Sequence, residues 1–299
     1  DDKLKNAVRR FQEASGLFVT GVAGNLTMEQ INVPATKRLA QIMVAMERER
    51  WLNQDLGDRH ILVNLTDFTA KIMDFGKVTF QTNSVVGAHD DDRRSPEFSD
   101  TMEHMIVNPS WYVPRSIITN EYLPMLQMDP TAVDFLELRD DLGNVVDRAG
   151  LDFNDFDEET FPFGMRQPPS VGNALGLVKF MFPNRNNIYL HDTPAKSLFG
   201  REVRAFSHGC IRLENPFGFA NALLAVQSLN PKTQFQEALD FGEEVQIDLN
   251  IHIPVHIIYR TAVTLPGGGL EFRRDIYGRD AKIWEALQLE GVVLSDFTG

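Results

Sequence analysis

The residues with the clearest chemical potential surround the chain's one cysteine. Cys210 directly follows His208 and Gly209, and a second histidine, His191, precedes them. A thiolate is a strong nucleophile, and a histidine within hydrogen-bond reach can take the thiol proton and return it to a leaving group. Glycine permits a tight turn that exposes the sulfur and directs amide N–H groups at an oxyanion. A lone cysteine is also common as a small buried hydrophobic residue, so the residue types alone leave both interpretations open.

The spacing of these residues is more specific than their types. His191 is followed by 15 residues and then by Ser207, His208, Gly209 and Cys210. This order resembles the signature of L,D-transpeptidases of the YkuD type, in which a histidine precedes a Ser/Thr-His-Gly-Cys run by a similar distance. The likeness covers most of residues 35–285 and is closest to the long YcbB-like subgroup of Gram-negative bacteria. It rests on the segments MERERWL, NPSWYVP, RQPPSVGNALGLVKFMFPN, YLHDTP and DIYGRDA.

The resemblance implies a role for each residue of the signature. Cys210 is the nucleophile, and His191 is the general base and then the general acid. The neighbouring Asp192 either orients the imidazole or is purely structural. Backbone N–H groups of His208, Gly209 and Cys210 form the oxyanion hole, and His208 shapes the turn rather than transferring a proton.

Five residues are candidates for binding substrate. The resemblance places Trp111 and Tyr189 in the substrate cleft, and plain core packing is the alternative for either. Arg212 stands where several family members have asparagine, and it either pairs with a substrate carboxylate or forms a structural salt bridge. Asn173 either hydrogen-bonds substrate or caps a turn, and Ser207 completes the predicted set.

The activity implied by the resemblance is acyl transfer on peptidoglycan. The cysteine attacks the carbonyl that precedes the terminal D-amino acid of a donor tetrapeptide stem. The side-chain amine of a diaminopimelate on an acceptor stem then takes the acyl group, which gives a 3→3 cross-link. No cofactor takes part, and carbapenem β-lactams are implied as covalent inhibitors. The same site could instead attach a protein to peptidoglycan or act as an L,D-carboxypeptidase or hydrolase, and a wall-binding protein with a silent site is the alternative outside enzymes.

Composition argues against several other functions. The chain has 29 basic and 42 acidic side chains, a net charge of −13, which disfavours a nucleic-acid partner. One cysteine excludes an intrachain disulfide, and His252 and His256 lack a nearby third ligand, so no metal site is predicted. The resemblance implies a periplasmic protein that is exported or anchored in the inner membrane through a segment that precedes this sequence. Wall-synthesis proteins are candidate partners.

The elements that must position these residues form an α+β pattern. The resemblance implies a YkuD-type β-sandwich catalytic domain with an inserted helical capping subdomain and an N-terminal helical segment. We expect a partial peptidoglycan-binding-like module at 1–34, a scaffold or linker helix at 35–58, and the catalytic domain at 59–299. The insertion, at about 115–163, is either a lid or an ordinary surface excursion.

Hydrophobic periodicity locates the main elements. Helical spacing predicts a helix over 34–52, with Leu39, Ile42, Met43 and Met46 on its apolar face and Arg48 on its wetter side. Asp74–Lys77 is typical of a hairpin turn between two strands. Further strands are predicted near 60–65, 78–82, 105–108, 187–190 and 244–264, and further helices near 216–229 and 235–240.

Overall fold

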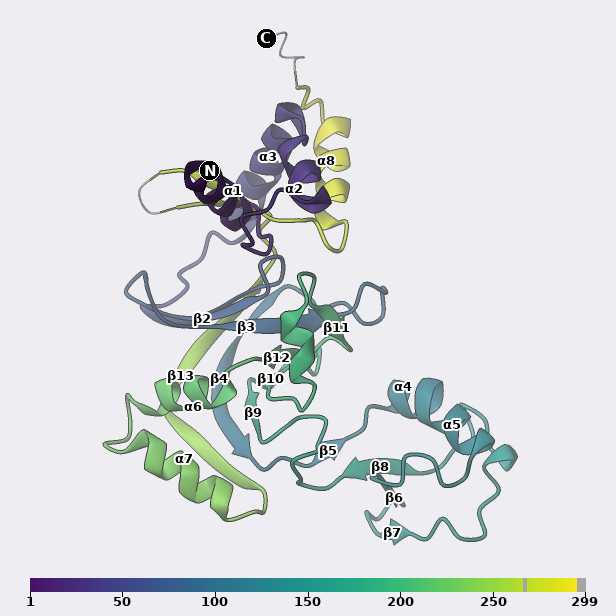
Figure 1. Cartoon of the computed structure of the whole chain (residues 1–299). Coiled ribbons are helices and arrows are strands. Elements are labelled where there is room, and N and C mark those ends of the chain that lie inside the picture. The colour runs from purple at the N-terminus through teal and green to yellow at the C-terminus, as the bar shows by residue number, and fades with distance from the viewer. Residues whose placement is uncertain (266–267, 295–299) are drawn as a thin grey trace.

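The fold is built around one large β-sheet that curls back on itself. The computed structural model describes residues 1–265 and 268–294. The sheet contains β1 (Arg59–Asn64), β2 (Thr69–Asp74), β3 (Lys77–Gly87), β4 (Phe98–Val107), β9 (Val178–Met181), β10 (Leu190–His191), β11 (Ala205–Ser207), β12 (Ile211–Leu213) and β13 (Val245–Ile258). Its order is β11-β3-β12-β10-β9-β4-β13-β1-β2, and β2 pairs with β3 as well, so the sheet closes around its core (Figure 1).

The hairpin between β2 and β3 confirms the predicted turn. Asp74 pairs with Lys77, which leaves Phe75 and Gly76 as the two turn residues. Both have positive φ angles, 50° for Phe75 and 74° for Gly76, as a two-residue turn that follows the strand twist requires. This turn begins β3, the strand that closes the sheet.

The main hydrophobic core lies inside the curled sheet. Alternate residues of the strands point inward, and the apolar helices α6 (Pro216–Leu224) and α7 (Pro231–Asp240) add side chains such as Phe219 and Phe235. The side chain of Asn215 accepts a hydrogen bond from the N–H of Gly218 and begins α6. The register of β13 against β4 shifts between Asp248 and Ile253, and Ile251 in this irregular stretch is exposed rather than part of the core.

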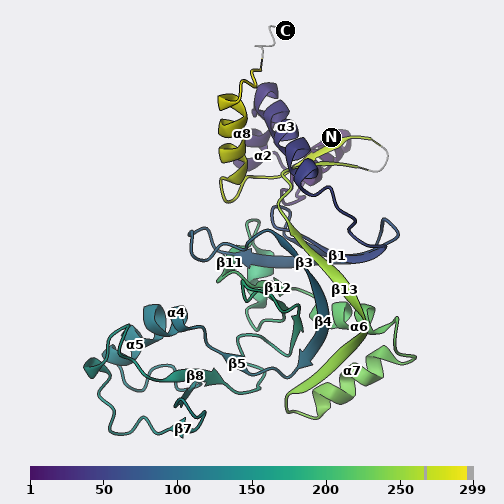
Figure 2. The same ribbon diagram turned by 180° about the vertical axis from the view of Figure 1, so that it is seen from behind.

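Helices from both ends of the chain gather at one end of the molecule. They are α1 (Asp2–Ala14), α2 (Asn25–Ile31), α3 (Ala35–Trp51) and α8 (Arg279–Leu289), beside the small hairpin β14 (Ala262–Thr264) and β15 (Leu270–Phe272). Figures 1 and 2 show this helical end on the far side of the sheet from the insertion. Within the described residues, no helix has the length and apolar character needed to cross a bilayer.

The predicted faces of α3 are partly wrong. Met46, placed on the apolar face, is 64% exposed, whereas Arg48, placed on the wetter side, is 3% exposed. Arg48 is buried because its guanidinium bonds Asp280 of α8 and Glu97, at 2.9 and 2.7 Å, and lies over the ring of Tyr259. Helical periodicity could not reveal these partners, because they are far from α3 in the sequence.

The insertion is a small subdomain with its own core. Its helical turns are α4 (Arg115–Ile117), a π-helical turn (Ile118–Tyr122), α5 (Leu123–Met128) and a 3₁₀ turn (Phe153–Asp155). A four-stranded sheet in the order β5-β8-β6-β7 joins them, a feature the sequence analysis did not predict. Its strands are β5 (Trp111–Tyr112), β6 (Glu137–Arg139), β7 (Val145–Val146) and β8 (Gly164–Gln167). Buried residues such as Leu126, Leu138 and Phe153 form a second hydrophobic cluster, so the segment is more than a loop.

Removing Arg48 should destabilise the helical end of the protein. We expect Arg48→Met to lower the free energy of unfolding by about 3 kcal/mol, because buried Asp280 would lose its cation. Urea denaturation measures this change. Arg50→Met is the matched control, since the Arg50 side chain is 78% exposed and should contribute little. Equal stability of the two variants would contradict a structural role for the buried pair.

Candidate active site

Most of the predicted site residues line one cavity of about 530 Å³. It lies where the face of β9, β10 and β12 meets the loop at 207–210 and the start of the insertion. The predicted residues on its wall are Trp111, Tyr189, His191, Ser207, His208, Cys210 and Arg212. Asp192, Gly209 and Asn173 are not on the wall. The candidate nucleophile and base therefore line the same cavity.

His191 is held by its place in the sheet and by one hydrogen bond. It ends the two-residue strand β10, where Leu190 points into the core and His191 points into the cavity. Its Nδ1 lies 2.5 Å from the backbone carbonyl of Asp192. A carbonyl oxygen can only accept, so Nδ1 carries the hydrogen and Nε2 is left to accept a proton.

The surroundings of His191 keep its ring neutral. Its pKa is lowered to about 3, chiefly by burial and in smaller part by the nearby cations of Arg212 and Lys179. The carbonyls of Asp192 and Leu175 oppose this effect but do not outweigh it. At neutral pH the imidazole is therefore an uncharged base.

The carboxylate of Asp192 has a structural role and does not orient the imidazole of His191. It accepts hydrogen bonds from the N–H of Leu177 at 2.9 Å and from Nζ of Lys196 at 2.6 Å. The backbone carbonyl of Asp192, not its carboxylate, bonds the imidazole of His191. The prediction of Asp192 as a catalytic side chain is therefore corrected, because its carboxylate points away from the ring and into these two contacts.

The loop that carries Cys210 depends on Gly209 and Ser207. Gly209 has a φ of 107°, and a Cβ at this position would lie 3.1 Å from the side chain of Ile188, so the turn requires glycine. The hydroxyl of Ser207 donates to the carbonyl of Cys210 at 2.5 Å and accepts from the N–H of Gly209 at 3.2 Å. Ser207 was predicted to contact substrate, but both of these hydrogen bonds of its hydroxyl lie within the loop and shape it.

Cys210 is half-buried and lines the cavity. The thiol lies 3.7 Å from the backbone carbonyl of Asn187, toward which it points. Burial raises the pKa of the Cys210 thiol to about 11, although the backbone and hydroxyl of Tyr189 and the charge of Arg212 favour the thiolate. The resting pair is thus a neutral thiol and a neutral imidazole.

The predicted oxyanion hole is only partly present. The N–H of Gly209 already donates to Ser207 and is not available, which corrects that part of the prediction. The N–H groups of His208 and Cys210 have no hydrogen-bond partner within residues 1–265 and 268–294. These two remain as candidate donors to an oxyanion at the cavity.

Two of the predicted aromatic contacts form the cavity wall, but Asn173 does not. Trp111 packs edge-to-face on Tyr122 at 6.3 Å between ring centroids, and Tyr189 packs on His191 at 5.6 Å. Asn173 is completely buried, and its amide donates to the carbonyls of Pro109, Gln167 and Pro168. The prediction that Asn173 binds substrate is wrong, because this amide holds a loop together.

The structure adds residues that the sequence analysis missed. Glu121, Tyr122 and Lys179 line the cavity, and Oε1 of Glu121 accepts a hydrogen bond from Nε2 of His208 at 2.6 Å. Glu121 and Tyr122 come from the insertion, far from the signature in the sequence. The only sequence signal for Lys179 was its place within an alternating strand next to the one that carries His191.

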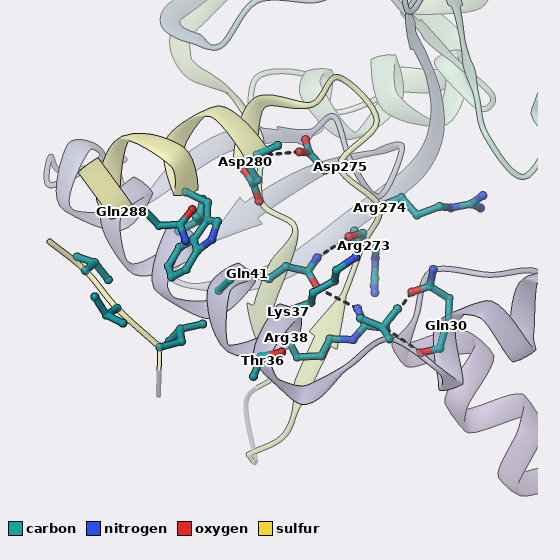
Figure 3. Close-up of a pocket in the computed structure, with 18 residues that line it drawn as sticks. Gln30, Thr36, Lys37, Arg38, Gln41, Arg273, Arg274, Asp275, Asp280 and Gln288 are labelled. Atoms are coloured by element: carbon teal, nitrogen blue, oxygen red, sulfur yellow. Dashed lines mark hydrogen bonds between the residues drawn. The ribbon is translucent and has the colours of Figure 1, made fainter. Parts of the chain in front are cut away.

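A larger cavity of about 810 Å³ lies away from these residues, between α3, α8 and the segment after β15 (Figure 3). Its wall contains no cysteine or histidine. The guanidinium of Arg38 bonds the side chains of Gln30 and Gln41, and the amide of Gln41 bonds the carbonyl of Arg273. Asp275 accepts from Tyr259 and from the N–H of Ala281. Because these polar groups bond one another, the larger cavity is a poor candidate for the active site.

The two histidines of β13 do not act as a pair. His252 is exposed, whereas His256 is buried between the hydroxyl of Ser99 and the carbonyl of Leu56, at 2.7 and 3.0 Å. Within the described residues, no group of three or more His, Cys, Asp or Glu side chains is placed to hold a metal ion.

Comparison with known proteins gives a consistent result. The model of the L,D-transpeptidase catalytic domain, YkuD, matches residues 58–234, and a peptidoglycan binding domain model matches residues 1–31. A Haemophilus influenzae protein described as an L,D-transpeptidase is 32% identical over 225 residues, which are 75% of this chain and 45% of that protein. This chain thus spans less than half the length of that relative.

Solved structures are more distant. The L,D-transpeptidase of Mycobacterium smegmatis is 12% identical, with 67% of this chain and 58% of that chain covered and a TM-score of 0.31. An L,D-transpeptidase in complex with imipenem is 11% identical, with 67% and 59% covered and a TM-score of 0.29. The family model covers more than half of the chain and includes both His191 and Cys210. The protein therefore belongs to the YkuD family of L,D-transpeptidases.

Proposed function

We propose that this protein forms 3→3 cross-links between peptidoglycan stem peptides through an acyl-enzyme on Cys210. The observation that supports this most strongly is the shared cavity, in which Cys210 lies with a neutral His191 whose Nε2 is unprotonated. The wall substrate would place the protein in the periplasm. The N-terminal match to a peptidoglycan binding domain fits the same substrate.

The first half-reaction acylates the enzyme. The thiol of Cys210 turns from the carbonyl of Asn187 toward His191, gives its proton to Nε2, and attacks the carbonyl that precedes the terminal D-amino acid. The N–H groups of His208 and Cys210 stabilise the oxyanion. The C–N bond then breaks, and the D-amino acid leaves with the proton from His191, so a thioester remains on Cys210.

The second half-reaction transfers the acyl group. The side-chain amine of an acceptor diaminopimelate attacks the thioester, and His191 takes a proton from this amine. The C–S bond then breaks and His191 returns the proton to the sulfur, so that the thiol of Cys210 is restored. Water is the competing acceptor, so the cavity must exclude it. A carbapenem presents a strained carbonyl to the same sulfur, and we expect it to acylate Cys210.

The insertion is suited to limiting the entry of water. Trp111, Ile117 and Tyr122 bring apolar surface to the cavity, and Glu121 connects the insertion to His208 on the nucleophile loop. This contact joins two regions that are 87 residues apart in the sequence. We infer that it holds the insertion over the acyl-enzyme.

The cross-linking activity can be tested with purified disaccharide-tetrapeptide. Wild type should yield a dimer that lacks one D-amino acid, whereas Cys210→Ala should yield none, because no other nucleophile can form the thioester. Mass spectrometry of the products measures both. Trimmed monomer alone would instead indicate a carboxypeptidase, and dimer formation by the Cys210→Ala variant would refute the acyl-enzyme. A carbapenem adduct on wild type but not on this variant is the companion measurement.

The raised pKa of the Cys210 thiol predicts the pH dependence of its alkylation. A pKa near 11 means that the thiolate fraction rises about tenfold per pH unit between pH 7 and 10, so the alkylation rate by iodoacetamide should rise in parallel. The same protein unfolded in urea is the control, and its rate should level off near the ordinary thiol pKa of about 8.5. A rate in the folded protein that is constant from pH 6 to 8 would instead indicate a preformed thiolate–imidazolium pair.

Loss of the Glu121–His208 contact should favour hydrolysis over cross-linking. We expect Glu121→Ala to lower the ratio of dimer to trimmed monomer roughly fivefold, the equivalent of about 1 kcal/mol for one partly exposed hydrogen bond. The matched control is Glu159→Ala, which removes an exposed carboxylate of the insertion that does not line the cavity. An unchanged product ratio in a folded Glu121→Ala variant would refute the role given to this contact.

A further inference from the structure

Three side chains form a row across the strands behind the catalytic cysteine. His191 of β10 is paired with Lys179 of β9 on one side and with Arg212 of β12 on the other. Directly paired residues of adjacent strands share a face of the sheet, so the three side chains lie next to one another. All three line the cavity. The candidate base therefore lies between two cations.

Neither cation has an acidic partner in the part of the chain that the structure describes. Lys179 and Arg212 form no salt bridge and no side-chain hydrogen bond there, and Nε of Arg212 is buried without a partner. The nearest acid to act on Lys179 is Glu244, whose Oε2 instead accepts from the N–H of Ser110 at 2.6 Å.

This lack of partners is unusual for the molecule. The chain has a net charge of −13, and other partly buried arginines have polar partners: Arg166 is paired with Glu137, and Arg204 donates to the carbonyl of Ser84. Burial lowers the pKa of both Lys179 and Arg212, and the opposing influence of Glu244 on Lys179 and of Cys210 on Arg212 is smaller than this effect. Two desolvated cations that face a cavity form a site for an anionic group of a ligand.

The chemistry of the reaction indicates which anion this is. His191 must return its proton to the nitrogen of the leaving D-amino acid. In an α-amino acid the carbon bonded to this nitrogen also bears the carboxylate. A nitrogen within reach of His191 therefore places the carboxylate beside His191 as well, on the side of one cation or the other.

We propose that Lys179 and Arg212 form a subsite for the free α-carboxylate of the terminal D-residue of the donor stem. This inference rests on the proposed function and specifies its substrate as a stem that ends in a free carboxylate. When bound, the carboxylate also offsets the two cations next to His191, so that the ring becomes a stronger base only when a donor is present.

The same subsite fits the acceptor. In the reacting centre of diaminopimelate, an amine and a carboxylate are attached to one carbon, as they are in the D-amino acid that has just left. An acceptor carboxylate between Lys179 and Arg212 would place its amine where the leaving nitrogen was. Water has no carboxylate and gains nothing from the subsite, which favours transfer over hydrolysis.

The test compares a tetrapeptide donor with its C-terminal carboxamide. Wild type should process the acid roughly 10- to 100-fold faster than the amide in kcat/KM, the range for a hydrogen-bonded ion pair of about 1.5–3 kcal/mol. Lys179→Met and Arg212→Met should each reduce this ratio, mainly by slowing turnover of the acid. Lys179→Arg should restore most of it. Lys282→Met on α8 is the matched control and should keep the wild-type ratio, since Lys282 is exposed and does not line the cavity.

The outcomes separate this inference from the proposed function. If wild type fails to process the acid in a Cys210-dependent way, the proposed function itself fails. If wild type processes acid and amide equally, the function stands and the carboxylate subsite is refuted. If the acid is preferred but both Met variants keep the wild-type ratio, the carboxylate is bound elsewhere and the assignment of Lys179 and Arg212 is wrong. The comparison of acid and amide on wild type needs no variant to fold.

Discussion

The pairing of the short strand β10 between β9 and β12 is the constraint on which the site depends. Only Leu190 and His191 belong to β10, yet their hydrogen bonds join three segments that are well separated in the sequence. Leu190 packs into the main core, and this burial fixes the opposite face for His191. One residue earlier, the carbonyl of Tyr189 accepts from the N–H of Ile211, which places Cys210 beside Tyr189. A shift of the register by one residue would therefore turn His191 into the hydrophobic core and Leu190 into the cavity.

Burial also determines the charge state of the site. Desolvation favours the neutral forms of both the Cys210 thiol and the His191 imidazole, which gives pKa values of about 11 and about 3. Lys179 and Arg212 are desolvated as well, and within the described residues they form no salt bridge. Such a site has a low reactivity toward small electrophiles at neutral pH. Under the inference drawn above, the carboxylate of the donor strengthens His191 as a base, which is a physical basis for selectivity.

The sequence predicted the positions of the chemistry better than its contacts. The spacing of His191 and Cys210 placed both on the wall of one cavity, because the signature includes the strand and the glycine turn that present them. The hairpin at Phe75 and Gly76 was predictable for the same reason, since two-residue turns follow local rules.

Contacts that depend on distant segments could not be predicted in this way. Arg48 is buried because Asp280 is brought to it by the C-terminal helix, and no periodicity in α3 contains that information. The amide of Asn173 and the carboxylate of Asp192 are used by neighbouring backbone groups, whose positions follow from the loop geometry. Glu121 reaches His208 only because the fold brings the insertion close to the loop at 207–210. Residue type indicated a polar role in each case but did not identify the partner.

The cavity lies at the boundary between two separate hydrophobic clusters, and this arrangement connects packing to function. The main core belongs to the curled sheet, whereas the second cluster belongs to the insertion, and Tyr189 packs against both. Tyr189 also acts on the sulfur of Cys210 through its hydroxyl and backbone. A movement of the insertion would change the packing of Tyr189 and, with it, the polarity around the thiol. Among the residues that the structure describes, no buried one belongs to both clusters, so Tyr189 is the side chain that connects them. The boundary between them is therefore where substrate entry, exclusion of water and the reactivity of Cys210 are physically coupled.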